Sequence, residues 1–205
     1  AYALRRDGKV DMDAYRRLAA LPLAQRADQV EAIEGLGFAA GKDHIPAAAL
    51  LAQYFYDTVA PRNVSRVRAL VGLLAQRNQR HPTLDKMGRE ASTIEKAAQG
   101  TKASVRAFFD AYRAATAAAA TGFGVQTAGG KCERLELKSA SATDIRGAEY
   151  LPLKGTMVAD SYLVKGAWTE FWTFAGCGQE VPVKVAFQAD GWGGASFSAA
   201  HNKGE

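Results

Sequence analysis

The stretch that decides the fold is residues 158–197, VADSYLVKGAWTEFWTFAGCGQEVPVKVAFQADGWGGASF. Short runs rich in β-branched and aromatic residues are separated in it by Lys165-Gly166, Gly178-Gln179 and Asp190-Gly191. Two-residue turns in which glycine supplies a positive φ are the strongest local signal for a β-hairpin. The stretch therefore predicts a meander of antiparallel strands.

The first two turns assign the same residues to one face of this sheet. A two-residue loop at the first places Leu163 opposite Trp168, and one at the second places Trp172 opposite Val185. A sheet with one buried side requires this kind of agreement, because side chains alternate between its faces. The predicted apolar face consists of Met157, Ala159, Leu163, Trp168, Trp172, Phe174, Val183, Val185 and Phe187.

The third turn decides where the last strand points its side chains. A strict two-residue loop at Asp190-Gly191 would turn Phe197 to the polar face. A three-residue turn with a bulge instead places Ala195, Phe197 and Ala199 on the apolar face, and this is the prediction.

Glu170 is the exception on the predicted apolar face, with Ser161 opposite it. Acids in apolar surroundings are over-represented at functional sites, so Glu170 is a candidate ligand-binding residue or the acid of a hydrolase-type enzyme. The alternative is that Glu170 lies where the sheet runs beyond its cover, or pairs with a Lys or Arg of the helical part.

The two cysteines, Cys132 and Cys177, both lie in the β region, and this placement predicts one disulfide between them. The alternative is two unconnected buried thiols in a cytosolic protein. The chain begins Ala1-Tyr2 without an initiator Met, which fits a removed signal peptide or an arbitrarily chosen start. Together with a disulfide, this favours a periplasmic or secreted protein.

The hydrophobic period becomes helical between Asp11 and about Ala120. Pro46, Pro61 and Pro82 mark helix starts, and glycines mark stops. The sequence predicts five or six helices: one beginning near Met12, then residues 23–36, 47–59, 61 or 63 to about 78, 83 or 84 to about 99, and 102–120.

A segment rich in Gly, Thr and Ala follows the last helix and divides the chain into a helical domain, 1–121, and an antiparallel β domain, 122–205. The net charge of +5 belongs to the helical domain, which holds 18 Lys or Arg against 12 Asp or Glu. No apolar run is long enough to span a bilayer.

Four arginines of the fourth predicted helix fall on one flank of a helical wheel: Arg62, Arg66, Arg77 and Arg80. Such a row could meet a protein, a glycan or an anionic lipid surface. The absence of aromatic residues between the arginines argues against nucleic acid. The alternative is a solvated face with ion pairs to acids such as Asp57.

Common motifs of chemistry fail on spacing. Neither a phosphate loop, a dinucleotide fingerprint nor a nucleophile elbow fits, and the three histidines lie far apart in sequence, so no metal site and no cofactor is predicted. Asn63 matches a glycosylation acceptor, yet a helix N-cap explains it as well. Trp192, in a glycine-rich turn, is a candidate for stacking on a ligand or partner.

These observations predict an α+β protein with an N-terminal bundle of five or six helices and a C-terminal β-meander of four or five strands with one disulfide. The sheet is to be covered by the last helix, with Phe108, Phe109 and Tyr112, or by its own curl. The function hypotheses are a non-catalytic exported bacterial binding or adaptor protein, a lipid or small-ligand carrier with an apolar pocket between helices and sheet, and an enzyme that uses Glu170 as its acid.

Overall fold

The computed structural model describes residues 5–6, 9–10, 21–126, 135–154 and 162–202. Within them the chain forms five α-helices followed by an antiparallel sheet of five strands. This confirms the predicted α+β class and the order of its two parts. The first predicted helix, near Met12, lies outside the described residues, and so does Cys132, so its disulfide with Cys177 stays a prediction.

The helices are α2 (Ala27–Gly41), α3 (Ile45–Asp57), α4 (Asn63–Gln76), α5 (Pro82–Ala97) and α6 (Val105–Gln126), with a short 3₁₀ turn, η2 (Leu23–Gln25), before α2. The strands of the sheet are β3 (Glu136–Ala142), β4 (Arg146–Tyr150), β5 (Leu163–Gly176), β6 (Gln179–Ala189) and β7 (Ala195–His201). Their order is β3-β5-β6-β7, and β4 also pairs with β5. A separate pair of two-residue strands, β1 (Arg5–Arg6) and β2 (Lys9–Val10), precedes them.

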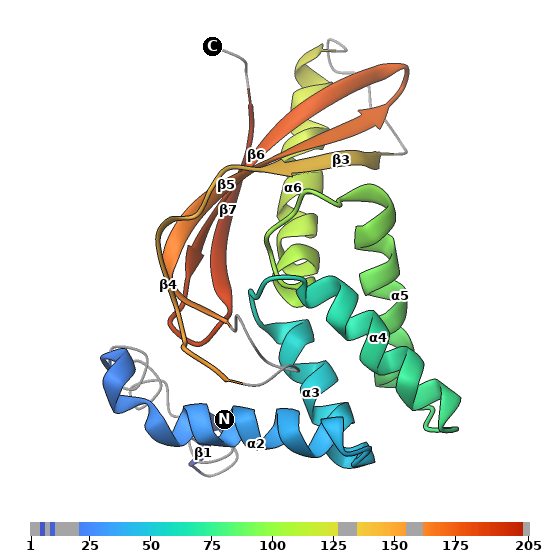
Figure 1. Ribbon diagram of the computed structural model, residues 1–205. Coiled ribbons are helices and arrows are strands. Elements are labelled where there is room, and N and C mark those ends of the chain that lie inside the picture. The colour runs from blue at the N-terminus through green and yellow to red at the C-terminus, as the bar shows by residue number, and fades with distance from the viewer. Residues whose placement is uncertain (1–4, 7–8, 11–20, 127–134, 155–161, 203–205) are drawn as a thin grey trace.

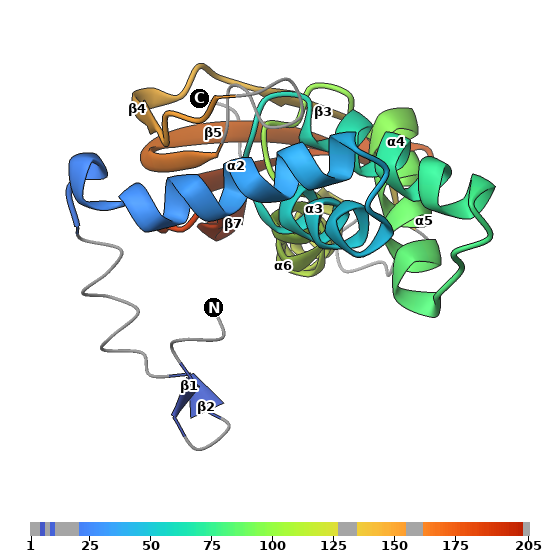
Figure 2. The ribbon, with the colours of Figure 1, turned by 60° about the horizontal axis from the view of Figure 1, so that its bottom comes forward.

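The helices surround the sheet on one side and at one end. Figure 1 shows α6 running beside the sheet, with α4 and α5 beyond it. Figure 2 shows α2 crossing one end of the sheet next to α3. Two histidines set the starts of helices: the Nδ1 atom of His44 accepts from the Ala47 N–H at 3.2 Å, and that of His81 accepts from Thr83 at 3.2 Å. A proline in the first turn of each helix completes these starts.

The predicted turn at Lys165-Gly166 is wrong, because β5 runs straight through it. Arg146 of β4 pairs with Ala167, while Glu149 pairs with Lys165, so β4 carries a bulge opposite Gly166. A Cβ atom on Gly166 would lie 2.7 Å from Cγ2 of Ile145. This glycine therefore permits the close approach of a neighbouring strand rather than a turn. Met157, Ala159 and Ser161, which the turn would have paired with β5, lie outside the described residues.

The turn between β5 and β6 lies one residue earlier than predicted, at Cys177-Gly178. Both residues have positive φ, 48° and 75°, as a two-residue hairpin loop of this kind requires. Trp172 consequently pairs with Val183 rather than Val185. The shift changes the register by two residues, so every side chain keeps its predicted face.

The loop between β6 and β7 has five residues, 190–194, rather than the predicted three. Phe187 pairs with Phe197, and Val185 pairs with Ala199. The prediction that Ala195, Phe197 and Ala199 share the apolar face is therefore confirmed, although the predicted loop length is wrong. The odd number of loop residues preserves the face.

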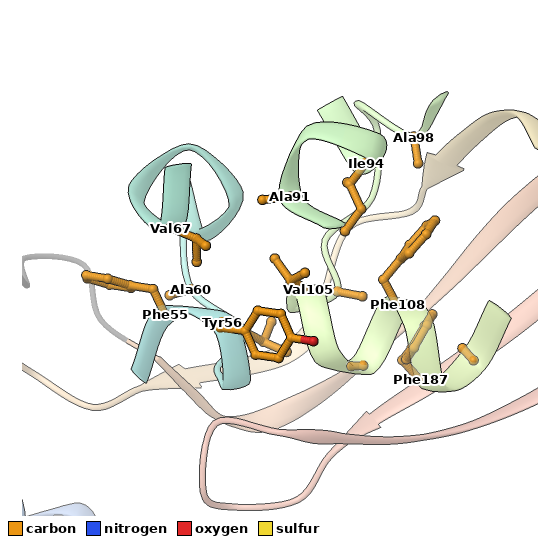
Figure 3. Packing of buried hydrophobic residues seen from close by; sticks show 14 of the residues in the cluster. Phe55, Tyr56, Ala60, Val67, Ala91, Ile94, Ala98, Val105, Phe108 and Phe187 are labelled. Carbon is orange, nitrogen blue, oxygen red and sulfur yellow. The ribbon is translucent and has the colours of Figure 1, made fainter. Parts of the chain in front are cut away.

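Helix α6 covers the apolar face of the sheet. The ring centroid of Phe108 lies 4.6 Å from that of Trp172, and the Tyr112 ring lies 5.8 Å from Phe174. Figure 3 shows Val105 of the same helix turned toward α4 and α5. Of the two covers considered, the last helix is the one that forms. It runs six residues beyond its predicted end, through Thr121 and Gly122 to Gln126.

The helical and β parts share one hydrophobic core, which includes residues of all five helices and of the sheet. The link between α3 and α4 also bonds directly to the sheet. The Val59 N–H donates to the Gly193 carbonyl at 2.5 Å, and the Leu163 N–H donates to the Val59 carbonyl at 2.8 Å. Division into domains at residues 121 and 122 stays a prediction.

Candidate functional site

Glu170 lies at the centre of the sheet and is fully buried, with 0 % of its surface exposed. Its neighbours across the strands are Val185 of β6 and Ala142 of β3. The alternative that it lies beyond the cover of the sheet is therefore wrong. A carboxyl group in such a place is stable only if its oxygens are hydrogen-bonded.

Five donors surround the carboxyl group of Glu170, and both of its oxygens act as acceptors. Within β5, the indole N–H of Trp168 donates to Oε1 at 2.9 Å, and that of Trp172 donates to Oε2 at 2.8 Å. The hydroxyl of Thr101 lies 2.8 Å from Oε2. The backbone N–H groups of Lys102 and Ala103 reach Oε1 at 2.8 and 3.2 Å. Glu170 thus takes the place of water as the hydrogen-bond acceptor for the indole N–H groups of two tryptophans and for the donors of one loop.

The loop that Glu170 holds connects α5 to α6. Gly100 passes so near β3 that a Cβ atom on it would lie 2.4 Å from the Ala140 carbonyl oxygen. Three residues after Thr101, the hydroxyl of Ser104 accepts from the Ala107 N–H at 3.0 Å and caps the start of α6. Glu170 therefore fixes the start of the helix that covers its own sheet.

A cleft of about 770 Å³ lies next to this loop, between the helical part on one side and β4 with the two residues before it on the other. Its apolar lining includes Val59, Ala60, Ile94, Ala98, Ile145 and Tyr150, and its polar lining includes Arg62, Asn63, Ser65, Glu95, Thr101, Lys102 and Asp144. A volume of this size is typical of sites for small molecules. Thr101 lines the cleft and also contacts Glu170, so the buried carboxyl group supports the wall without facing the cleft.

Two ion pairs account for three of the charged residues that line the cleft. Lys102 Nζ lies 3.1 Å from Asp144 Oδ1, and Glu95 pairs with Arg68 of α4. Arg62 lines the cleft without an ion pair to any residue that the structure describes. Its backbone is left-handed, with φ of 56°, at the residue before α4. The described charges of the cleft therefore leave one positive group.

The four arginines of the predicted row do not share one helix, because α4 begins at Asn63 and ends at Gln76. Arg62 precedes the helix, and Arg77 and Arg80 follow it, so Arg66 alone of the four lies within it. The guanidinium carbon of Arg66 lies 4.9 Å from the ring centroid of Phe55. Arg77 pairs with Asp43 at 3.2 Å. The inward side of α4 carries Val67, Leu70 and Leu74, which are all buried.

Asp57, the predicted partner of these arginines, pairs with Arg106 of α6 instead. The same guanidinium group lies 5.6 Å from the ring of Tyr56, at the edge of a second cavity of about 490 Å³. The hydroxyl of Tyr56 donates to Glu90 Oε2 at 2.5 Å. Burial, followed by this hydrogen bond, raises the pKa of Tyr56 above its ordinary value. These contacts join α3, α5 and α6.

Trp192 lies in the loop between β6 and β7, partly buried against Arg26. Its backbone N–H donates to Asp190 Oδ1 at 2.7 Å, and the Arg26 guanidinium carbon lies 5.9 Å from its ring. Arg26 is itself 6 % exposed and donates to the Gly191 carbonyl at 2.6 Å. Trp192 thus helps to fix the start of α2 on the sheet. It does not line the cleft described above.

Tyr162 is buried beside this cluster and accepts a hydrogen bond from Gln29. Burial raises the pKa of Tyr162 to about 12, although the nearby Arg26 acts in the opposite direction. The burial of Tyr162 is explained by the loop of Gly193, whose missing Cβ atom leaves room for the Tyr162 ring.

Asn63 is buried at the start of α4, and its side chain bonds to the backbone on two sides. Its Nδ2 donates to the Thr58 carbonyl at 3.0 Å, and its Oδ1 accepts from the Val64 N–H at 2.9 Å. The amide nitrogen is therefore enclosed. The acceptor of a glycan needs the opposite, an accessible amide on the surface.

Among the described residues, no three His, Cys, Asp or Glu side chains gather in the way that a metal ion would need. None of the described helices combines the length and the apolar character needed to cross a membrane. Comparison of the chain with known protein families, with curated proteins and with solved structures finds no match. The cleft beside Thr101 and Lys102 is the candidate binding site.

The β wall of this cleft was not predictable from the sequence. Ile145 lies just before β4 and Tyr150 is its last residue. The five residues of this strand are all exposed and show no alternation of apolar and polar side chains. The hydroxyl of Thr101 was missed because its partner is 69 residues away. Neither feature leaves a signal in local sequence.

Proposed function

We propose that this protein is a non-catalytic binding protein that holds a small ligand in the cleft between its helices and strand β4. The observation that carries the proposal is the cleft itself, about 770 Å³, lined from one side by the α3–α4 link and α5 and from the other by Ile145, Ala148 and Tyr150. An apolar lining with a few polar groups is typical of ligand sites. Of the hypotheses from sequence, this geometry supports the small-ligand carrier best.

Burial of Glu170 argues for binding rather than catalysis at this place. A general acid must reach the atom that it protonates. Both carboxyl oxygens of Glu170 are occupied by donors of the protein, and the side chain is fully buried. Its geometry supports a role in holding the wall of the cleft.

Binding in the cleft can be tested with N-phenyl-1-naphthylamine, a neutral apolar dye that fluoresces more strongly away from water. We expect saturable binding with a dissociation constant on the order of 10 μM, typical of a weakly specific apolar probe. Ala148 is exposed and lines the cleft, so Ala148→Trp should fill it without disturbing the core and should weaken binding at least tenfold.

The matched control is Ala200→Trp, the same substitution at an exposed position of β7 outside the cleft lining. It should leave the affinity unchanged. Equal binding by the two tryptophan variants, or the absence of saturable binding by the unmodified protein, would reject the cleft as the site.

We also propose that the protein works in an oxidising compartment, the periplasm or the outside of the cell, with Cys132 and Cys177 joined. Cys177 lies at the tip of the β5–β6 hairpin, which projects beyond β3 in Figure 1. Structural disulfides persist mainly in such compartments. Protein isolated from its native source should gain two mass units on reduction. Before reduction, the peptides that contain the two cysteines should be found joined to each other. Two free thiols in that preparation would remove the argument for export.

A further inference from the structure

We infer that the ligand of the cleft is an amphiphile with one anionic group, a carboxylate in the simplest case, which Arg62 binds while the apolar part lies against Ile94, Ile145 and Tyr150. This inference rests on the proposed function and adds the chemical class of the ligand. It also assigns a binding role to Arg62 that differs from its predicted place in a row of surface arginines.

The charges around the cleft favour a ligand with a negative charge. Glu95 and Asp144 are each neutralised by an ion pair, to Arg68 and Lys102. Arg62 is left as a positive group with no ion pair among the described residues. A guanidinium group prefers carboxylates and related oxyanions, because its planar N–H groups match two oxygens at once. A cationic ligand would meet this charge with no free acid to offset it.

The remaining lining suits a molecule with an apolar body. Ile94 and Ala98 of the helical side are buried, and Ile145 and Tyr150 provide the opposite wall. The Tyr150 side chain is 37 % exposed, so its ring can cover a ligand while its hydroxyl stays available. Like any tyrosine hydroxyl it is a neutral hydrogen-bond donor at neutral pH, and burial raises its pKa further above the ordinary value. An anionic oxygen could accept from it.

The test compares two ligands that differ only in the head group, dodecanoate and 1-dodecanol, by displacement of N-phenyl-1-naphthylamine from the full chain. Dodecanoate should bind at least tenfold more tightly, because a charge-assisted hydrogen bond contributes about 1.5–3 kcal/mol and a tenfold change in affinity corresponds to about 1.4 kcal/mol. Arg62→Ala should weaken the binding of dodecanoate about tenfold and should change the affinity for dodecanol by less than twofold. Arg62→Lys should keep part of the preference.

Two further variants separate the guanidinium group from other effects of substitution. Arg89→Ala removes an exposed arginine of α5 that does not line the cleft, and should change neither affinity. Arg62→Gly should lose dodecanoate binding as Arg62→Ala does, while its unfolding midpoint rises, since glycine adopts the left-handed backbone at φ of 56° without strain. Loss of binding in a more stable protein cannot be ascribed to unfolding.

Each outcome has a distinct meaning. Equal affinity for the acid and the alcohol, or equal weakening of both by Arg62→Ala, would overturn the anionic class and leave the proposed binding function intact. The inference would also be overturned if neither compound displaced the dye while Ala148→Trp still prevented the dye from binding. Failure of the dye to bind at all would overturn both the inference and the proposed function.

Discussion

Glu170→Ala should lower the free energy of unfolding by about 4 kcal/mol, the largest effect that we expect from a single polar substitution in this protein. The change removes the acceptor that the described residues provide for the indole N–H groups of Trp168 and Trp172, both fully buried. A buried donor left without a partner costs about 1–3 kcal/mol. Urea unfolding followed by circular dichroism measures the loss.

Glu170→Gln separates a structural role from a catalytic one. The amide keeps the shape of the side chain but replaces one oxygen by an NH₂ group, which must face at least one of the donors now bound there. We expect the free energy of unfolding to fall by about 2 kcal/mol, because one buried donor loses its acceptor and the new NH₂ group faces another donor. An enzyme acid would behave differently, since its amide variant would fold normally and lose only activity.

The control for both substitutions is Glu180→Gln on β6, where the glutamate is exposed. It should change the free energy of unfolding by less than about 0.5 kcal/mol, as surface substitutions usually do. A Glu170→Gln protein with the unfolding midpoint of the unmodified chain would contradict the structural role and return the acid to consideration as a catalytic group.

The faces of the β5–β6 hairpin were predictable from sequence although its turn was misplaced. Strand side chains alternate with a period of two, so a two-residue loop moved by one residue changes the partner of Trp172 from Val185 to Val183 without changing its face. The error at Lys165-Gly166 was not compensated in this way, because no turn forms there. Glycine marks turns and close strand contacts alike, and only Ile145, 21 residues away, distinguishes the two.

The candidate site was predictable only in part. Alternation correctly identified Glu170 as an acid among apolar side chains, because that property is local. Its donors Thr101, Lys102 and Ala103 come from a loop whose position depends on the packing of α5 and α6. The cleft likewise arises between elements that are distant in sequence. Local patterns carry no information on which segments meet in space.

The end of α6 shows how composition can hide a periodic signal. Thr121 and the glycines at 122 and 124 suggested a joint between domains. Yet Ala111, Ala115, Ala119 and Phe123 recur every four residues and are all buried, so the helical stripe continues beyond the predicted end. The two glycines lie in that helix for different reasons, and these reasons lead to opposite predictions.

Gly122→Ala should destabilise the protein by about 2 kcal/mol, although alanine forms helices better than glycine. A Cβ atom at this position would lie 2.6 Å from Cγ1 of Val181 and 2.8 Å from Cδ2 of His201. The His201 ring could turn aside, but Val181 is fully buried and branched at Cβ, so relief requires α6 to move away from the sheet. The loss of packing therefore outweighs the gain in helix propensity.

Gly124→Ala is the matched control, two residues further along α6. No heavy atom lies within 4 Å of a Cβ atom placed there, so the substitution should stabilise the protein by up to about 1 kcal/mol through helix propensity alone. Thermal unfolding of the two variants should give shifts of opposite sign. If both variants gain stability, α6 does not rest against β6 at Gly122, and the packing that positions Phe108 and Tyr112 over the sheet would have to be different.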